Sequence, residues 1–274
     1  MTDTALATLD FERSFGGLRR LYGHSGAQRV FDSHAVVVGI GGVGSWVAEA
    51  FARSGVQRIS LVDLDHIAES NINRQLHATV NTLGQSKIEA MRERIAAINP
   101  VCRVDLVDAF VDADNWPDIV QQLDLDGTPA PVAVVDACDQ VRAKTAMAAW
   151  SLQHSCAFVS VGAAGGKRQS HLMQIDDLAQ VTHDPLLAQL RYRLRKQHSA
   201  PKVGRMKVAC VFSREPVAQP AQASCNVDGD AGEGVAGDGS LNCHGYGSSV
   251  AVTAAFGMAA AGWCMQAIAN STKR

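Results

Sequence analysis

The segment AVVVGIGGVGSWVAEAFARSGVQRISLVD, residues 35–63, determines the fold. Its uninterrupted apolar run at 35–40 predicts a strand that is covered on both faces. The run ends in glycines, and apolar side chains then recur at helical spacing over 43–51. A second apolar run at 58–63 closes the segment. Since a helix separates the two strands, the segment predicts a crossover unit with parallel strands.

The same alternation continues along the first half of the chain. Apolar patterns predict further strands at 102–107, 131–137 and 157–162 and helices at 88–98, 116–123 and 143–154. Strands that are joined through helices require crossover connections. We therefore expect an α/β fold built on a doubly wound, mainly parallel, Rossmann-like sheet.

The second half of the chain is less regular and predicts a smaller α+β extension. Strand patterns at 170–175 and 206–212 flank a helix pattern at 185–197. Residues 226–240 contain four acids, five glycines and no basic residue, which is typical of a flexible loop. The expected organisation is an N-terminal helical arm at 1–34, a Rossmann-like core at 35–165 and a C-terminal part at 166–274.

The overall composition excludes several classes of protein. The chain has 274 residues, of which 47% are hydrophobic and 19% are charged, and its formal net charge is -2. These values are typical of a globular protein and exclude a disordered chain. None of the cysteines forms a C-x-x-C pair, which argues against a zinc site and against a secreted disulfide framework. The N-terminal segment lacks the apolar stretch of a secretory signal, so we expect a cytoplasmic protein.

One uncharged segment, residues 248–269, is long enough to cross a bilayer. Its apolarity comes largely from alanine and glycine, and it also contains polar residues such as Ser249 and Gln266. We expect a helix packed closely against the sheet, with membrane association as the minor alternative.

A glycine motif lies between the first strand and its helix. Gly39, Gly41 and Gly44 form G-x-G-x-x-G, and Asp63 ends the next strand. The glycines permit a tight turn and close approach of the backbone to a ligand, and the helix N-terminus presents N–H groups to phosphate. An acid at the second strand end can bind ribose hydroxyls. The motif alone indicates an adenine nucleotide, with NAD as the general alternative.

Polar and cationic side chains after the second strand favour a triphosphate. Asn71, Arg74 and Lys87 follow that strand. A dinucleotide dehydrogenase needs no further cations there, whereas an enzyme that cleaves ATP between its α- and β-phosphates must neutralise the departing pyrophosphate. Asp136 and Asp139 form an acid pair at the end of a later strand, where Asp139 is a candidate ligand of Mg²⁺.

Four motifs occur in a fixed order: G-x-G-x-x-G, D-x-D-x-x-x-x-S-N-x-x-R-Q, G-Q-x-K and D-x-x-D. Over residues 11–175, the chain resembles the adenylating domain of ubiquitin-activating enzymes and of their bacterial relatives that activate sulfur-carrier proteins. The resemblance implies an ATP-binding core in which a carboxylate attacks the α-phosphorus, giving an acyl adenylate and pyrophosphate. It implies ribose binding by Asp63, phosphate binding by Asn71, Arg74 and Lys87, and magnesium binding by Asp139. The implied nucleotide-binding set is Gly39, Gly41, Gly42, Gly44, Asp63, Asp65, Asn71, Arg74, Lys87 and Asp139.

In the resembling enzymes, an arginine near the N-terminus reaches into the site of the neighbouring subunit. Arg20 is the best match, with Arg19 and Arg13 as further candidates. The resemblance therefore implies a homodimer. It also implies a catalytic set made of Arg20, Arg74, Lys87 and Asp139.

One branch, the tRNA threonylcarbamoyladenosine dehydratases, resembles nearly the whole chain. The resemblance is carried by FERSFGGLRRLYG (11–23), SVGAAGGKRQ (160–169) and KVACVFSREP (207–216), and the zinc-binding cysteine pairs of the sulfur-carrier activators are missing. Members use ATP to activate the threonine carboxylate of a modified adenosine beside the anticodon, and an internal nucleophile of the modification then closes a ring. The resemblance implies ATP and Mg²⁺, a monovalent cation (K⁺ or Na⁺), no zinc, and a cysteine desulfurase with its sulfur acceptor as partners.

The segment 185–214 contains eight basic side chains and no acid. Such a segment can follow an RNA backbone, with binding that depends on salt, and a solvated helix face is the alternative. Lys167 and Arg168 follow the glycines of GAAGG and could guide the anticodon loop. The predicted tRNA-binding set is Lys167, Arg168, Arg191, Arg193, Arg195, Lys196, Lys202, Arg205 and Lys207.

Other functions stay open from the sequence. The main alternative is an adenylyltransferase that activates the C-terminal glycine of a sulfur-carrier or ubiquitin-like protein, and the missing zinc pairs argue against it. An NAD-dependent oxidoreductase would leave Arg74 and Lys87 without a role, and a non-catalytic scaffold would not need the full set of phosphate ligands. Cys210 and Cys243 are candidate reactive cysteines, although a buried, inert thiol is the commoner case.

Overall fold

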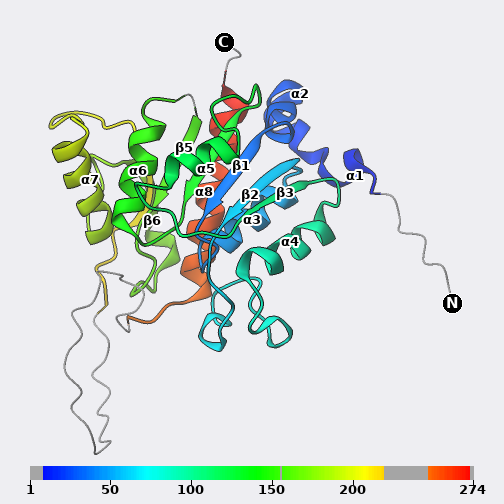
Figure 1. The fold of residues 1–274 in the computed structure, drawn as a ribbon, viewed down its shortest axis with the longest axis horizontal. Coiled ribbons are helices and arrows are strands. Elements are labelled where there is room, and N and C mark those ends of the chain that lie inside the picture. Colours follow the sequence, from blue (N-terminus) through cyan, green and yellow to red (C-terminus); the bar gives the residue numbers. More distant parts are fainter. Residues whose placement is uncertain (1–8, 155, 219–245, 272–274) are drawn as a thin grey trace, which may run out of the picture.

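A seven-stranded sheet with the order β3-β2-β1-β4-β5-β7-β6 forms the centre of the molecule (Figure 1). The structure, a computed structural model, describes residues 9–154, 156–218 and 246–271, so the predicted loop at 226–240 and Cys243 lie outside the described residues. The strands are β1 (His34–Val38), β2 (Arg58–Val62), β3 (Arg103–Val107), β4 (Val132–Asp136), β5 (Cys156–Val161), β6 (Met173–Asp177) and β7 (Ala209–Ser213). The helices are α1 (Phe11–Phe15), α2 (Gly17–Phe31), α3 (Gly44–Arg53), α4 (Lys87–Ile98), α5 (Trp116–Gln122), α6 (Val141–Ser151), α7 (Pro185–Gln197) and α8 (Val250–Asn270), with short 3₁₀ turns η1 (Glu69–Asn71), η2 (Val80–Thr82) and η3 (Ser170–Leu172).

The strand order locates the point where a ligand can bind. Neighbouring strands pair in parallel except β6, which pairs antiparallel with β7. The chain runs from β1 to β2 and β3 on one side and then returns to β4 on the other side of β1. In open α/β sheets, ligands bind outside the carboxyl ends of the strands at such a reversal. The predicted doubly wound, mainly parallel sheet is confirmed.

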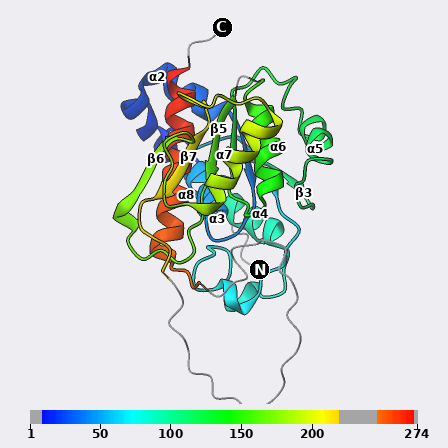
Figure 2. The same ribbon diagram turned by 90° about the vertical axis from the view of Figure 1, so that its left-hand side faces the viewer.

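Side chains of the central strands alternate between two apolar layers. Val37 and Val135 belong to the layer that contains residues of α3, α4 and α8. Val36 and Val134 belong to the layer that contains residues of α5, α6 and α7. Figure 2 shows α8 on one side of the sheet and α6 and α7 on the other. Because β1 is buried on both faces, its sequence has no alternation of polar and apolar residues.

The uncharged segment near the C-terminus forms α8. Its N-terminus is capped by Ser249, whose side chain accepts the N–H of Ala251. By length and composition alone, α8 could cross a membrane. However, Val252, Phe256 and Ile268 are buried in the layer shared with α3, and the helix also contacts α2, β4 and β5. The structure therefore places α8 in the core.

The ends of β6 and β7, at the edge of the sheet, differ from those predicted from the sequence. Strand β7 begins at Ala209 rather than at residue 206, and β6 ends at Asp177 rather than at residue 175. The carboxylate of Asp177 accepts the N–H groups of Met206 at 2.8 Å and of Lys207 at 2.7 Å, and Lys207 has a φ of 61°. These contacts hold the chain outside the extended conformation until Ala209, because a positive φ is incompatible with a strand.

Gly257 allows α8 to approach α3 closely. A Cβ atom built at Gly257 would lie 2.6 Å from the carbonyl oxygen of Val43 and 2.8 Å from the Cβ of Trp46. A Cβ atom built at Gly262, on the same helix, would meet no atom within 4 Å. The two glycines therefore differ in whether the helix packing requires them.

We expect Gly257→Ala to lower the free energy of unfolding by about 1–3 kcal/mol, because the added methyl group forces α8 away from α3. Gly262→Ala is the matched control, and it should raise the free energy of unfolding by roughly 0.5–1 kcal/mol, because alanine favours the helix. Urea denaturation followed by circular dichroism measures both values. Unchanged stability of Gly257→Ala would contradict the close contact between the helices.

Candidate functional site

The glycine turn after β1 lies at the reversal of strand order. Gly39 has a φ of +87°, and a Cβ atom there would lie 2.9 Å from the carbonyl oxygen of Ala137. A Cβ atom at Gly44 would overlap the carbonyl oxygen of Gly39, so both glycines are required by the turn and by the packing of α3. A Cβ atom at Gly41 would meet only the Nε2 of Gln75, 4.0 Å away. The packing of the chain itself thus leaves open space at Gly41.

Helix α3 starts directly after this turn and has no side-chain cap. The first N–H groups of a helix have no partner within the helix. The helix dipole adds a partial positive charge at the same end. The turn and the start of α3 are therefore suited to bind an anion such as phosphate.

Asp63 connects this turn to the end of β2. Its Oδ2 accepts the N–H of Ile40 at 2.6 Å, and its Oδ1 accepts the N–H of Asp65 at 2.8 Å. Burial raises the pKa of Asp63, and the ammonium group of Lys87 opposes that rise. Each carboxylate oxygen has a second lone pair, so Asp63 can still accept hydrogen bonds from ribose hydroxyls.

Lys87, the first residue of α4, lies beside the same edge of the sheet. Its Nζ lies 2.6 Å from Oδ2 of Asp65, and the Lys87 side chain is only 7% exposed. The backbone N–H of Lys87 also donates to the carbonyl oxygen of Asp65 at 3.0 Å. These two contacts fix the start of α4 against the loop after β2 and hold the ammonium charge near Asp63.

Arg74 lies over the glycine turn. A Cβ atom at Gly42 would meet the Cγ of Arg74 at 3.2 Å, and the indole N–H of Trp46 donates to the carbonyl oxygen of Arg74 at 3.1 Å. The guanidinium group donates to the carbonyl oxygen of Ser70 and to Oδ1 of Asn73. Burial lowers the pKa of Arg74. The structure thus brings Arg74 next to the turn and to the start of α3.

Asn71 is buried at the end of η1. Its Oδ1 accepts the N–H of Ala68 at 3.0 Å. The carbonyl oxygen of Asn71 accepts the N–H of Arg74 at 3.1 Å. Asn71 therefore shapes the turn from which Arg74 extends.

A buried ion pair supports the loop after β4. The Nζ of Lys144 lies 3.0 Å from Oδ1 of Asp136 and donates to the carbonyl oxygen of Val161 at 2.7 Å. The hydroxyl of Ser160 donates to Oδ2 of Asp136 at 2.6 Å. Burial opposes the charge on Lys144, but Asp136 outweighs this effect and raises the pKa of Lys144. Asp136 is therefore enclosed in the core, whereas Asp139 is partly exposed.

Lys144 is absent from the residues predicted from the sequence. It lies on α6 beside the buried Ala143, in the same turn as the buried Met147. A lysine within the apolar stripe of a helix is the sequence signal that could have identified this buried charge.

Lys167 is turned into the protein. Its Nζ donates to the carbonyl oxygens of His183 at 3.2 Å and Ser213 at 3.5 Å, and also to that of Glu215. Lys167 is 3% exposed, and burial lowers its pKa. The Glu215 carboxylate accepts the backbone N–H of Arg168. The structure argues against the predicted tRNA contact of Lys167, because backbone carbonyls occupy its donors, whereas Arg168 is exposed.

Most of the predicted tRNA-binding side chains in 185–214 face solvent. Arg191 is different, because its guanidinium group donates to the carbonyl oxygens of Leu178 at 3.0 Å and Val181 at 2.8 Å and so ties α7 to the preceding loop. Arg195 donates to two carbonyl oxygens of the following loop and stays partly exposed. Besides the partly exposed Arg191, the exposed or partly exposed members are Arg193, Arg195, Lys196, Lys202, Arg205 and Lys207.

The three N-terminal arginine candidates lie in different environments. The Nη2 of Arg19 lies 2.6 Å from Oε1 of Glu12, and its guanidinium carbon lies 5.1 Å from the ring centre of Phe31. Arg19 is therefore engaged within its own chain. Arg20 and Arg13 are exposed.

The described residues support neither a nucleophilic Cys210 nor a cluster of metal-binding side chains. Cys210 is fully buried in β7, and burial raises the pKa of its thiol well above the ordinary value, so it is not an activated nucleophile. Within residues 9–154, 156–218 and 246–271, no group of three or more His, Cys, Asp or Glu side chains could hold a metal ion. A magnesium ion that is bound mainly by substrate phosphates and one carboxylate does not need such a group.

Known proteins share this fold and sequence. Residues 13–274 match the ThiF family. The chain is 40% identical to a tRNA threonylcarbamoyladenosine dehydratase from Escherichia coli over 255 residues, covering 91% of both chains. It is 37% identical to a protein of the same name from Haemophilus influenzae, covering 93% of both chains. A crystal structure of the E. coli dehydratase in complex with ATP matches with a TM-score of 0.78 and 38% identity over 94% of both chains.

Replacing Lys144 by methionine tests the support of the loop after β4. We expect Lys144→Met to lower the free energy of unfolding by about 3–5 kcal/mol, because it leaves the buried carboxylate of Asp136 without its counter-charge. The control is Arg103→Met, which breaks the exposed pair with Asp105 and should cost less than about 1 kcal/mol. Urea denaturation at neutral pH measures both. Equal losses would show that water reaches the Asp136–Lys144 pair.

Proposed function

The chain belongs to the ThiF family, and we propose that it uses ATP to remove water from threonylcarbamoyladenosine in tRNA, giving the cyclic derivative. The observation that carries the proposal is the similarity to tRNA threonylcarbamoyladenosine dehydratases over more than nine tenths of the chain. The likeness to a dehydratase structure with bound ATP supports ATP as the co-substrate.

The proposed reaction has two steps. A carboxylate oxygen of the threonine attacks the α-phosphorus of ATP, the bond to the β-phosphate oxygen breaks, and pyrophosphate leaves. An internal nucleophile of the modification then attacks the activated carbonyl and loses its proton, and AMP leaves with the former carboxylate oxygen. The RNA loses one water in total. Neither step requires a nucleophile from the protein, which agrees with the inert environment of Cys210.

The residues at the mouth of the sheet act by positioning and by neutralising charge. Asp63 accepts hydrogen bonds from the ribose hydroxyls, and the open space at Gly41 lets the phosphates approach the backbone. Asn71 and Arg74 hold the phosphates, and Lys87 compensates the charge that develops on the departing pyrophosphate.

Asp139 is the residue that would hold a magnesium ion together with the phosphates of ATP. It follows β4 at the carboxyl edge of the sheet and is partly exposed, and a single carboxylate with substrate phosphates suits this ion. When bound, the ion supplies positive charge to the phosphate oxygens. A monovalent cation, K⁺ or Na⁺, is carried over from the family resemblance without assigned ligands.

The tRNA is bound by the exposed basic side chains of α7 and the following loop. These groups can neutralise backbone phosphates, and no acid in 185–214 opposes them. The anticodon loop then reaches the ATP site at the mouth of the sheet. Arg168, which is exposed after the glycine-rich loop, lies in the segment assigned to guide it.

The proposed assembly is a cytoplasmic homodimer. The exposure of Arg20 supports a role in which it reaches the site of the neighbouring subunit, because Arg20 is not enclosed by its own chain. A cysteine desulfurase and its sulfur acceptor are proposed partners on the family resemblance alone.

The main alternative is adenylation of a carrier protein's C-terminal glycine. The similarity to tRNA dehydratases extends through the C-terminal part, where the basic segment lies, and this favours tRNA as the substrate. If the reaction required a carrier protein instead of tRNA, this alternative would be favoured.

Incubation of the protein with ATP, Mg²⁺ and tRNA that carries threonylcarbamoyladenosine tests the function directly. We expect mass spectrometry of the digested tRNA to show loss of one water from the modified nucleoside, with pyrophosphate released only when this tRNA is present. Pyrophosphate release that depends on a carrier protein, with unchanged tRNA, would contradict the proposal.

Lys87→Ala tests the phosphate-binding role of Lys87. Turnover should fall by at least about 100-fold, because the substitution removes a charge that stabilises the departing pyrophosphate. Arg92→Ala, which removes an exposed charge paired with Glu89 on the same helix, is the matched control and should keep wild-type turnover. Circular dichroism checks that both variants are folded. Near-normal turnover of folded Lys87→Ala would refute the role.

A further inference from the structure

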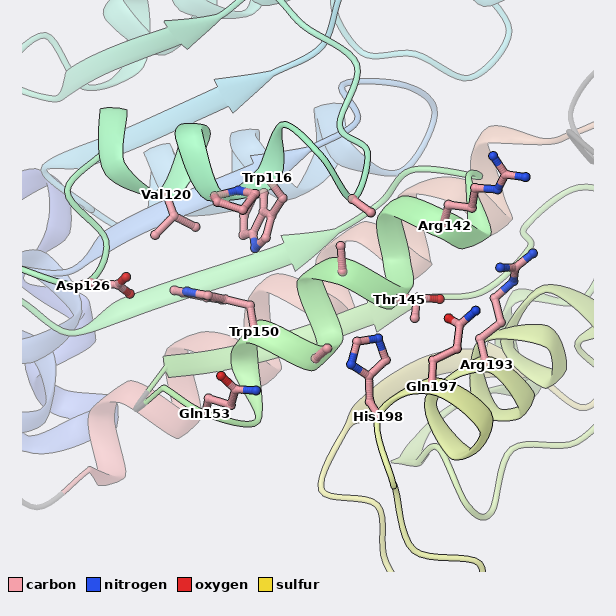
Figure 3. A pocket seen from close by; sticks show the side chains of 14 residues that line it. Trp116, Val120, Asp126, Arg142, Thr145, Trp150, Gln153, Arg193, Gln197 and His198 are labelled. Atoms are coloured by element: carbon pink, nitrogen blue, oxygen red, sulfur yellow. The ribbon is translucent and has the colours of Figure 1, made fainter.

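A hollow lies between α5, α6 and α7, on the face of the sheet opposite α3 and α8 (Figure 3). Its volume is about 680 Å³. Ligand pockets typically occupy roughly 300–1,000 Å³. None of the residues assigned above to the ATP site lines this pocket, so ATP binding does not explain it.

The pocket has two chemically different ends. Figure 3 shows the guanidinium groups of Arg142 and Arg193 at one end and Asp126 and Trp150 at the other. The lining between them is largely apolar and includes Trp116, whose ring meets the Trp150 ring edge to face with 5.6 Å between their centres. An anionic group is therefore favoured at the arginine end and disfavoured beside Asp126.

The arginine end lies close in the chain to the proposed magnesium ligand. Arg142 is in the first turn of α6, shortly after Asp139, at the carboxyl end of β4. Among the residues that the structure describes, neither Arg142 nor Arg193 has an ion-pair or hydrogen-bond partner. Figure 3 shows both guanidinium groups at this end of the pocket, and arginine binds phosphate with paired hydrogen bonds.

We propose that this pocket holds one nucleotide of the tRNA substrate, a neighbour of the adenosine that is modified; the proposal rests on the proposed function. Its phosphate binds Arg142 and Arg193, and its base enters the apolar part of the pocket beside Trp116. The side chains of Gln153 and Gln197 also line the pocket and can hydrogen-bond to a base edge.

The charge pattern favours a nucleotide within RNA over a free nucleotide. Arg193 belongs to the acid-free basic segment 185–214, which can neutralise phosphates on both sides of the bound nucleotide. Bases in a single-stranded loop can be unstacked and received by a protein pocket, which a duplex does not permit. Binding in the pocket would then set the position of the neighbouring adenosine at the mouth of the sheet.

Three pocket variants and one control test the proposal. Arg142→Gln and Arg193→Gln each remove one phosphate contact, and Ala146→Leu fills the apolar part without changing charge. Arg92→Gln removes a charge outside the pocket. The measurements are the Kd of the anticodon stem–loop RNA at several salt concentrations, the Kd of ATP, the Kd of cytidine monophosphate, and thermal unfolding as a check of folding.

Each pocket variant should raise the Kd of the RNA about tenfold and leave the Kd of ATP unchanged. The two arginine variants lose a charge-assisted contact, and Ala146→Leu fills the space that the base would occupy. The two arginine variants should also lower the slope of log K against log salt by about one unit, whereas Ala146→Leu should not. Arg92→Gln should bind the RNA like the wild type.

Wild-type RNA affinity in all three folded pocket variants would overturn the proposal. Tight binding of cytidine monophosphate that depends on Arg142 and Arg193, with unchanged RNA affinity, would also overturn it and would indicate a site for a free nucleotide. If the proposed function is wrong, the wild-type protein will dehydrate no tRNA. The RNA-binding measurements test the pocket separately from this activity.

Discussion

The carboxylate of Asp63 is the interaction on which the candidate site depends. It accepts one N–H from the glycine turn after β1 and another from the loop after β2, so it fixes two parts of the chain with one buried charge. Lys87 compensates that charge, and Asp65 in turn holds Lys87. Since Arg74 packs over Gly42 in the same turn, Asp63 fixes the positions of the two cationic groups, Arg74 and Lys87, that we propose bind the phosphates of ATP.

The sheet could be predicted from the sequence because its signals are local. The buried strands β1 and β4 are uninterrupted apolar runs, and the helices between successive strands require parallel crossover connections. The strand order itself comes from the structure. The boundaries of β6 and β7 could not be predicted, because they depend on Asp177 bonding to the backbone of residues 206 and 207. The domain boundaries at residues 34 and 165 stay predictions.

The site could be predicted only where a motif carries it. The glycines, Asp63, Arg74 and Lys87 are recognisable by spacing, and the structure gathers them at one edge. The burial of two other lysines depends on hydrogen-bond partners that are distant in the sequence. Lys144 donates to the carbonyl of Val161 and Lys167 donates to that of Ser213, and both are buried. The apolar stripe around Lys144 is a local signal of its burial, whereas the sequence around Lys167 has no such signal. The sequence shows how many cationic side chains a segment has. It does not show which of them will donate hydrogen bonds to backbone carbonyls in the folded chain.

The position of α8 has a consequence for biosynthesis. Among the described elements α8 leaves the ribosome last, yet it covers α3 and contacts α2, β4 and β5. Until it emerges, a nascent chain exposes the apolar surface that later packs around Phe256, and unpaired surface of this kind attracts chaperones and other nascent chains. The half of the chain that contains the predicted nucleotide-binding motifs is synthesised long before α8. It cannot finish packing until α8 covers it. We therefore expect the final folding step to wait until α8 has emerged.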